Sequence, residues 1–61
     1  MYEKEILEYM KRLKQPIMID EIAEKLGVSW QTAKTALLEL AASGKIKAKK
    51  HKGSWVFWYE L

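Results

Sequence analysis

The chain has 61 residues and a formal net charge of +3. A chain of this length forms one domain, residues 1–61, with a small core, because only about 60% of the unfolded surface is buried at that size. It contains no cysteine, so neither disulfide bonds nor thiolate metal sites supplement the core. No apolar run approaches the roughly 18 residues that span a bilayer, and the first residues lack the order of a signal peptide. We therefore expect a cytoplasmic protein.

The positive charge is concentrated at the C-terminal end. Residues 1–44 contain six Lys or Arg and seven Asp or Glu, a net charge of −1. Residues 45–61 contain five Lys and one Glu, a net charge of +4. Such an asymmetry says little about the fold, but it predicts an anionic partner, either nucleic acid or a membrane surface.

Helical periodicity dominates the first part of the chain. Apolar residues spaced by three and four alternate with charged ones, which is typical of an amphipathic helix. Pro16 cannot continue a helix, so this one should end near Lys14. The residues of its apolar stripe are Tyr2, Ile6, Leu7, Tyr9, Met10 and Leu13.

Residues 17–19 then form a short extended piece, and a second helix is expected to begin around Asp20. The carboxylates of Asp20 and Glu21 suit the positive end of a helix dipole. Gly27 can adopt the left-handed backbone conformation that ends a helix. The inward side chains of this helix are Ile22, Ala23 and Leu26.

A third helix is predicted from Ser29 to about Ser43. Ser29 is a favourable N-cap, and Gly44 provides the C-terminal stop. The predicted inward side chains are Ala33, Leu37 and Leu40.

From Ile46 onward the pattern alternates, as in a β-strand, with Ile46, Ala48 and Lys50 on one face and Lys47 and Lys49 on the other. Residues 50–54 are interpreted as a hairpin loop and residues 55–61 as the returning strand. One face of that strand should cap the core, with Trp55, Phe57, Tyr59 and Leu61. The other face carries Val56, Trp58 and Glu60. The predicted class is therefore α+β, mainly α with a small β-sheet.

The segment from Asp20 to Leu40 resembles the helix-turn-helix of winged-helix transcription regulators. The resemblance rests on a small residue in the second helix, a glycine and a hydrophobe in the turn, and two leucines in the third helix: Ala23, Gly27, Val28, Leu37 and Leu40. It continues through residues 43–46 into the basic hairpin, which resembles the wing. It is similar to regulators of the MarR and ArsR kind. The resemblance implies a three-helix winged helix-turn-helix with a C-terminal hairpin wing.

Such a domain is expected to bind double-stranded DNA, as a small transcriptional regulator or a chromatin-associated protein on the nucleoid. The third helix would fit a major groove about 12 Å wide. Gln31 can bond an adenine edge, Thr35 can contact a thymine methyl, and Lys34 can reach guanine or phosphate. The candidate recognition-helix residues are Ser29, Trp30, Gln31, Thr32, Lys34 and Thr35.

The hairpin is the candidate wing. Its cations would contact the phosphate backbone or enter the flanking minor groove. The residues are Lys47, Lys49, Lys50, His51 and Lys52. The alternative is that these lysines only keep an exposed strand edge solvated.

Other interpretations stay open for several residues. Trp30 would either pack against sugar and phosphate or cover the second helix. The carboxylates of Asp20, Glu21 and Glu24 fit a helix start better than acid–base chemistry. Ser29 and Ser54 have no plausible histidine partner except His51, and the chain has no cysteine, so no enzyme is predicted. No cofactor, metal or small-molecule ligand is expected.

Surplus apolar residues suggest a partner. We expect a homodimer through Tyr2, Leu7 and Tyr9, or through Val56 and Trp58. The alternative function is a winged-helix protein–protein interaction module of a larger assembly that uses the same residues. Single-stranded nucleic acid stacking on Trp30, Trp55 or Trp58 is a third interpretation, disfavoured because the core needs most aromatic residues.

Overall fold

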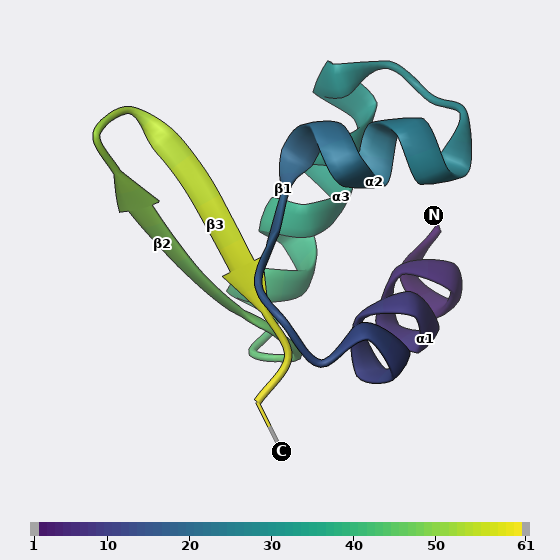
Figure 1. The fold of residues 1–61 in the computed structure, drawn as a ribbon, viewed down its shortest axis with the longest axis horizontal. Helices are drawn as coiled ribbons and strands as arrows, with labels where there is room; N and C mark the ends of the chain where they lie inside the picture. Colours follow the sequence, from purple (N-terminus) through teal and green to yellow (C-terminus); the bar gives the residue numbers. More distant parts are fainter. Residues whose placement is uncertain (1, 61) are drawn as a thin grey trace.

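A computed structural model describes residues 2–60 of the chain. Three helices pack on a three-stranded antiparallel sheet, and the β2–β3 hairpin extends away from the helices (Figure 1). This confirms the predicted α+β class and the three-helix arrangement with a C-terminal hairpin. The elements in chain order are α1 (Glu3–Leu13), β1 (Ile17–Met18), α2 (Ile19–Leu26), α3 (Trp30–Ala42), β2 (Lys47–His51) and β3 (Ser54–Trp58).

The first two helices end close to the expected positions. Lys14 adopts a left-handed conformation with φ of 58° after α1, and its N–H donates to the Met10 carbonyl at 3.1 Å. Gly27 adopts the same left-handed conformation after α2, with φ of 69°. The start of α2 differs, because Ile19 belongs to the helix rather than to the extended piece. The Glu21 carboxylate accepts the Met18 backbone N–H at 3.3 Å, which fixes this earlier start.

Both ends of α3 are capped as the sequence predicts. The Thr32 backbone N–H donates to the Ser29 hydroxyl at 3.1 Å, so Ser29 is the N-cap. At the other end the Gly44 N–H donates to the Ala41 carbonyl and the Lys45 N–H to the Leu40 carbonyl, each at 3.0 Å. This pair of bonds is a Schellman motif, and it satisfies carbonyls that the last helical turn leaves free.

The sheet has the strand order β1-β3-β2. Phe57 in β3 pairs with Ile17 on one side and Ala48 on the other, and this row faces the helices. The hairpin turn is tighter than the predicted loop, since residues 50, 51 and 54 lie in strands. Only Lys52 and Gly53 turn, with φ of 50° and 82°, and positive φ at both central residues suits the twist of a two-residue hairpin.

The core lies between the sheet and the helices. Phe57 and Ile17 are fully buried, and Trp55 and Tyr59 pack at the edge of the same cluster. Val56 is partly exposed on the opposite face, as the alternation predicts. The predicted position of Leu61 lies outside the described residues. The other core side chains are Ile6, Met10, Ile19, Ile22, Ala33, Ala36, Leu37, Leu40 and Ile46.

Within residues 2–60, no helix is both long enough and apolar enough to cross a membrane.

Candidate nucleic-acid interface

The outward face of α3 is open to solvent. Gln31 and Thr35, one helical turn apart, are both exposed. Ser29 and Thr32 lie at the start of the helix, where the Ser29 hydroxyl donates to the Thr32 hydroxyl at 2.9 Å. Because the Ser29 hydroxyl also accepts the Thr32 backbone N–H, it already makes two hydrogen bonds inside the cap, both with Thr32. These two residues therefore shape the helix start, and Gln31 and Thr35 are the polar side chains it presents.

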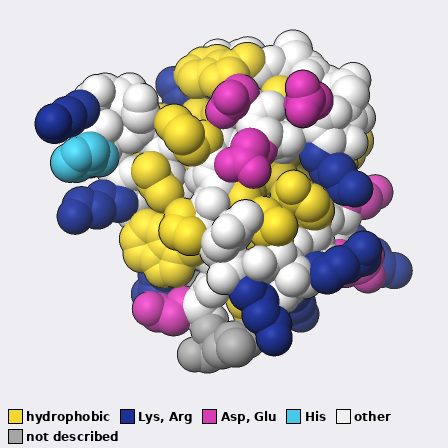
Figure 2. Space-filling model, viewed as in Figure 1, with side chains coloured by type: hydrophobic (Ala, Val, Ile, Leu, Met, Phe, Trp, Pro, Cys, Tyr) yellow, Lys and Arg dark blue, Asp and Glu magenta, His cyan; other side chains and the backbone are white. Residues whose placement is uncertain are grey.

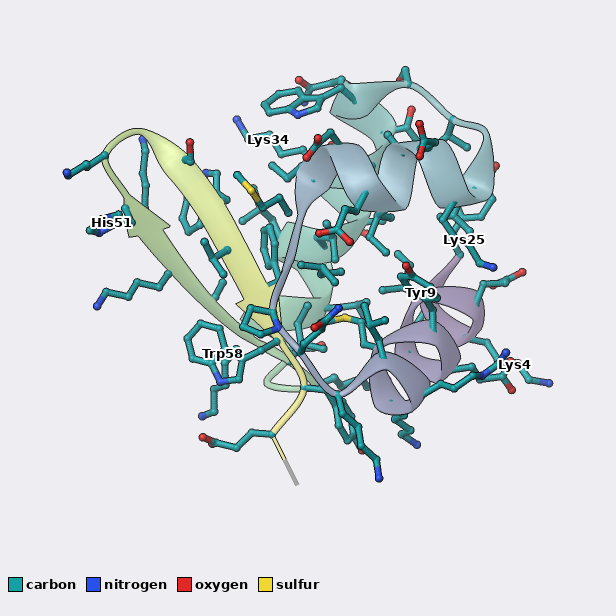
Figure 3. The ribbon with its side chains drawn as sticks, viewed as in Figure 1. Lys4, Tyr9, Lys25, Lys34, His51 and Trp58 are labelled. Atoms are coloured by element: carbon teal, nitrogen blue, oxygen red, sulfur yellow. The ribbon has the colours of Figure 1, made fainter. Side chains whose placement is uncertain are left out.

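Trp30 and Lys34 form a second pair along α3, on the side of the hairpin. The Lys34 ammonium lies 5.3 Å from the centre of the Trp30 ring. Figure 3 shows Lys34 directed from α3 toward the tip of the hairpin. Trp30 is half exposed and lines a groove with Ile19 and Asp20 at the start of α2. The indole therefore lies beside α2 without being buried by it.

Strand pairing divides the cations of the hairpin between two faces. Lys50 pairs with Trp55, and its ammonium lies 5.9 Å from the centre of that ring, on the face toward α3. Lys49 pairs with Val56 and Lys47 with Trp58, on the opposite face of the sheet. His51 shares that outer face by alternation. Lys52 lies at the turn.

The predicted wing is therefore not a single surface. One cation, Lys50, points into the space next to α3, whereas Lys47, Lys49 and His51 line the outer face of the hairpin. Lys47 also has an anionic neighbour, because its ammonium lies 3.8 Å from the Glu60 carboxylate. The hairpin tip and the start of α3 lie at the same end of the molecule (Figure 1).

The beginning of the chain borders the outward face of α3. Tyr2 lines a groove of about 270 Å³ with Gln31 and Thr35, and Glu39 lies one turn further along α3. An ion pair between Glu3 and Lys45 joins the start of α1 to the exit of α3. The hydrogen bond from Lys45, and then its charge, hold the pKa of the Glu3 carboxyl below its usual value.

Negative charge is concentrated away from the hairpin. Figure 2 shows acidic side chains gathered over α2, while lysine and histidine side chains protrude at the hairpin end. The exposed acidic residues of α2 are Asp20, Glu21 and Glu24. The exposed face of α2 is therefore acidic and the hairpin end of the molecule is basic.

The family model described as FaeA-like protein matches residues 2–60. The chain belongs to the FaeA-like family. No curated protein and no solved structure matches it.

The family assignment corrects one expectation. The resemblance to regulators of the MarR and ArsR kind was wrong at the level of the family, although the FaeA-like family is related to winged-helix regulators. The residues that carried the resemblance are a small residue in α2, a turn glycine, a turn hydrophobe and two core leucines. Many winged-helix families need these residues for the same packing reasons, so they identify the architecture and not the family.

Two residues of this FaeA-like chain join the candidate interface without having been predicted. Leu38 lies one turn after Lys34 and two turns after Gln31, and it is only partly buried. Helical spacing alone was sufficient to find it. Tyr2 was assigned only to a helix stripe and a dimer contact, because its position beside Gln31 depends on how α1 packs against α3.

Proposed function

We propose that this FaeA-like domain binds double-stranded DNA as a small regulator, with α3 in the major groove and the hairpin along the backbone. The observation that carries the proposal is the exposed polar face of α3 next to a cationic hairpin, at one end of the molecule. The width of an α-helix matches a major groove of about 12 Å.

The side chains on α3 supply the contacts that would distinguish bases. The Gln31 amide offers one donor and one acceptor for an adenine edge, and the Thr35 methyl suits a thymine methyl. Leu38 extends this surface with a further apolar contact. Lys34, on the hairpin side of the helix, is suited to a phosphate or a guanine.

The hairpin supplies the electrostatic attraction that does not depend on sequence. Lys50 approaches the backbone beside α3, and Lys47, Lys49 and His51 would follow the phosphates that flank it. If about five phosphates are neutralised, the logarithm of the binding constant falls with the logarithm of salt concentration at a slope of about −4 to −5.

A titration of random-sequence duplex DNA at several salt concentrations tests the proposal. The informative variant replaces Lys47, Lys49 and Lys50 with Gln. The matched control replaces three cations of α1, Lys4, Lys11 and Arg12, with Gln, which removes the same charge from another surface. We expect the hairpin variant to lose affinity and to flatten the slope by about 2 to 3, since each phosphate contact contributes about 0.9.

Two outcomes count against the proposal. One is the absence of salt-dependent binding by the unmodified chain. The other is an equal loss in both triple variants, because net charge and not the hairpin would then explain the attraction.

A further inference from the structure

We propose that the groove between the start of α3 and the hairpin binds an unpaired DNA base together with its phosphate. This inference deepens the proposed function and rests on it. The groove has a volume of about 170 Å³. Its lining includes Met18, Asp20, Trp30, Lys34, Lys50 and Trp55.

The apolar lining of this groove is unusually accessible. Met18 is 42% exposed and Trp30 is 50% exposed, and they are the exposed large hydrophobic residues of the described chain. Both lie in the same groove, on different elements. Trp55 adds a second indole on the hairpin side, and it is only partly buried. Trp55 also stacks on the buried Phe57, with the ring centres 6.0 Å apart, so the core uses part of its surface, as expected from the sequence. Trp30 is the indole that the core leaves free.

Each indole in the groove has a lysine ammonium over its ring. The Lys34 ammonium lies 5.3 Å from the Trp30 ring centre, and the Lys50 ammonium lies 5.9 Å from the Trp55 ring centre. An aromatic ring next to a cation is the arrangement by which proteins hold single-stranded nucleic acid, because the ring stacks on the base while the cation pairs with the phosphate. The Asp20 carboxylate at the rim can accept an N–H from the base.

A base can stack on an indole only if its own face is free. In an intact duplex both faces of each base are covered by neighbouring base pairs. A base therefore cannot reach an indole of the groove unless it first leaves the stack. Bases in a bulge or a single strand have free faces. The groove therefore favours duplexes that contain an unpaired base, while α3 and the hairpin cations hold the paired part.

The test compares three probes at one salt concentration: a perfect duplex, the same duplex with a bulge of unpaired thymines, and single-stranded oligothymidine. The informative variant is Trp30→Leu, whose half-exposed position makes folding tolerant of the change. Trp58→Leu is the matched control, since it removes a tryptophan from the opposite face of the sheet. Thermal unfolding by circular dichroism verifies that both variants are folded.

We expect the bulged duplex to bind more tightly than the perfect one, and Trp30→Leu to weaken binding to the bulged and single-stranded probes by about five- to a hundredfold. Binding to the perfect duplex should change much less, and Trp58→Leu should resemble the unmodified chain. Equal affinity for bulged and perfect duplexes, or equal effects of the two variants, overturns the inference while leaving duplex binding intact. Failure to bind any duplex overturns the proposed function instead.

A competing peptide tests whether the groove binds protein instead of nucleic acid. A peptide of glutamates and leucines would be held by the same lysines and apolar surface. If this peptide displaces neither oligothymidine nor the bulged duplex, the groove is a nucleotide site. If it binds in a Trp30-dependent manner and the bulge confers no advantage, the groove is a protein site and the inference is wrong.

Discussion

The Lys34 ammonium lies 5.3 Å from the centre of the Trp30 ring, one helical turn earlier in α3. A cation over an exposed aromatic ring is attracted by about 0.5–1 kcal/mol, which is sufficient to bias the orientation of a flexible side chain. The pair therefore holds the only cation of α3 toward the hairpin and the groove between them (Figure 3).

Replacing Lys34 with Ala should weaken duplex binding at every salt concentration and make the salt slope shallower by about 0.9. The natural control is Lys25→Ala on α2, because the Lys25 ammonium lies 5.2 Å from the Tyr9 ring and forms a matched pair on another surface. Fluorescence anisotropy of a labelled duplex measures both slopes. Identical salt slopes for the two variants would show that Lys34 is not part of the DNA interface.

Gln31 is expected to determine base preference. In Gln31→Ala, discrimination at one base-pair position should fall by about 1–3 kcal/mol, while binding to random DNA should change little. Selection from a randomised duplex pool measures the preference. The second glutamine of the chain, Gln15, is exposed in the connection between α1 and β1 and serves as the control. If Gln15→Ala and Gln31→Ala both select the same sequences as the unmodified chain, α3 does not read bases through Gln31.

Lys52 should be a site where stability can be gained. Its φ of 50° is unfavourable for most residues other than glycine, whereas asparagine tolerates this region because its short polar side chain can hydrogen-bond to the local backbone. Lys52→Asn is expected to raise the free energy of unfolding by about 0.5 kcal/mol. Gly53→Ala is the opposite case, because φ is 82° although the space around the glycine is free, and it should cost about 1 kcal/mol. Thermal unfolding that ranks the two variants the other way would exclude this turn conformation.

The ion pair of Glu3 with Lys45 should make stability depend on pH. Because the pKa of the folded Glu3 carboxyl is below its usual value, the ion pair contributes stability above the usual glutamate pKa and loses it as the pH falls through the lowered value. In Lys45→Gln the pKa of Glu3 should return toward its usual value in an NMR titration. Lys4→Gln removes the same charge from α1 and leaves the ion pair, so the pKa of Glu3 should stay lowered in that variant.

Residue patterns predicted the fold closely, because caps and stops act over a few residues. Ser29, Gly27 and Gly44 mark helix ends through local backbone bonds, and a local interaction can be found in a sequence. The errors were local as well. The start of α2 moved to Ile19 because the Glu21 carboxylate caps the Met18 N–H, and the hairpin loop shortened to Lys52 and Gly53.

The candidate site was predicted less completely. Helical spacing placed Gln31 and Thr35 on the outward face of α3, and the alternation of the hairpin separated Lys50 from Lys47 and Lys49. The groove joining Trp30 to Trp55 was not foreseen, because it forms between α3 and a strand more than twenty residues away.

By itself the sequence determined the order and ends of the elements, the side of each helix that is buried and the cationic end of the chain, since these follow from local backbone chemistry and periodicity. Tertiary structure alone decided that Tyr2 borders the outward face of α3 and that Trp30 faces the hairpin across a groove. Such contacts depend on the angles at which whole elements pack, and those angles are set by many side chains together and not by any short stretch of residues.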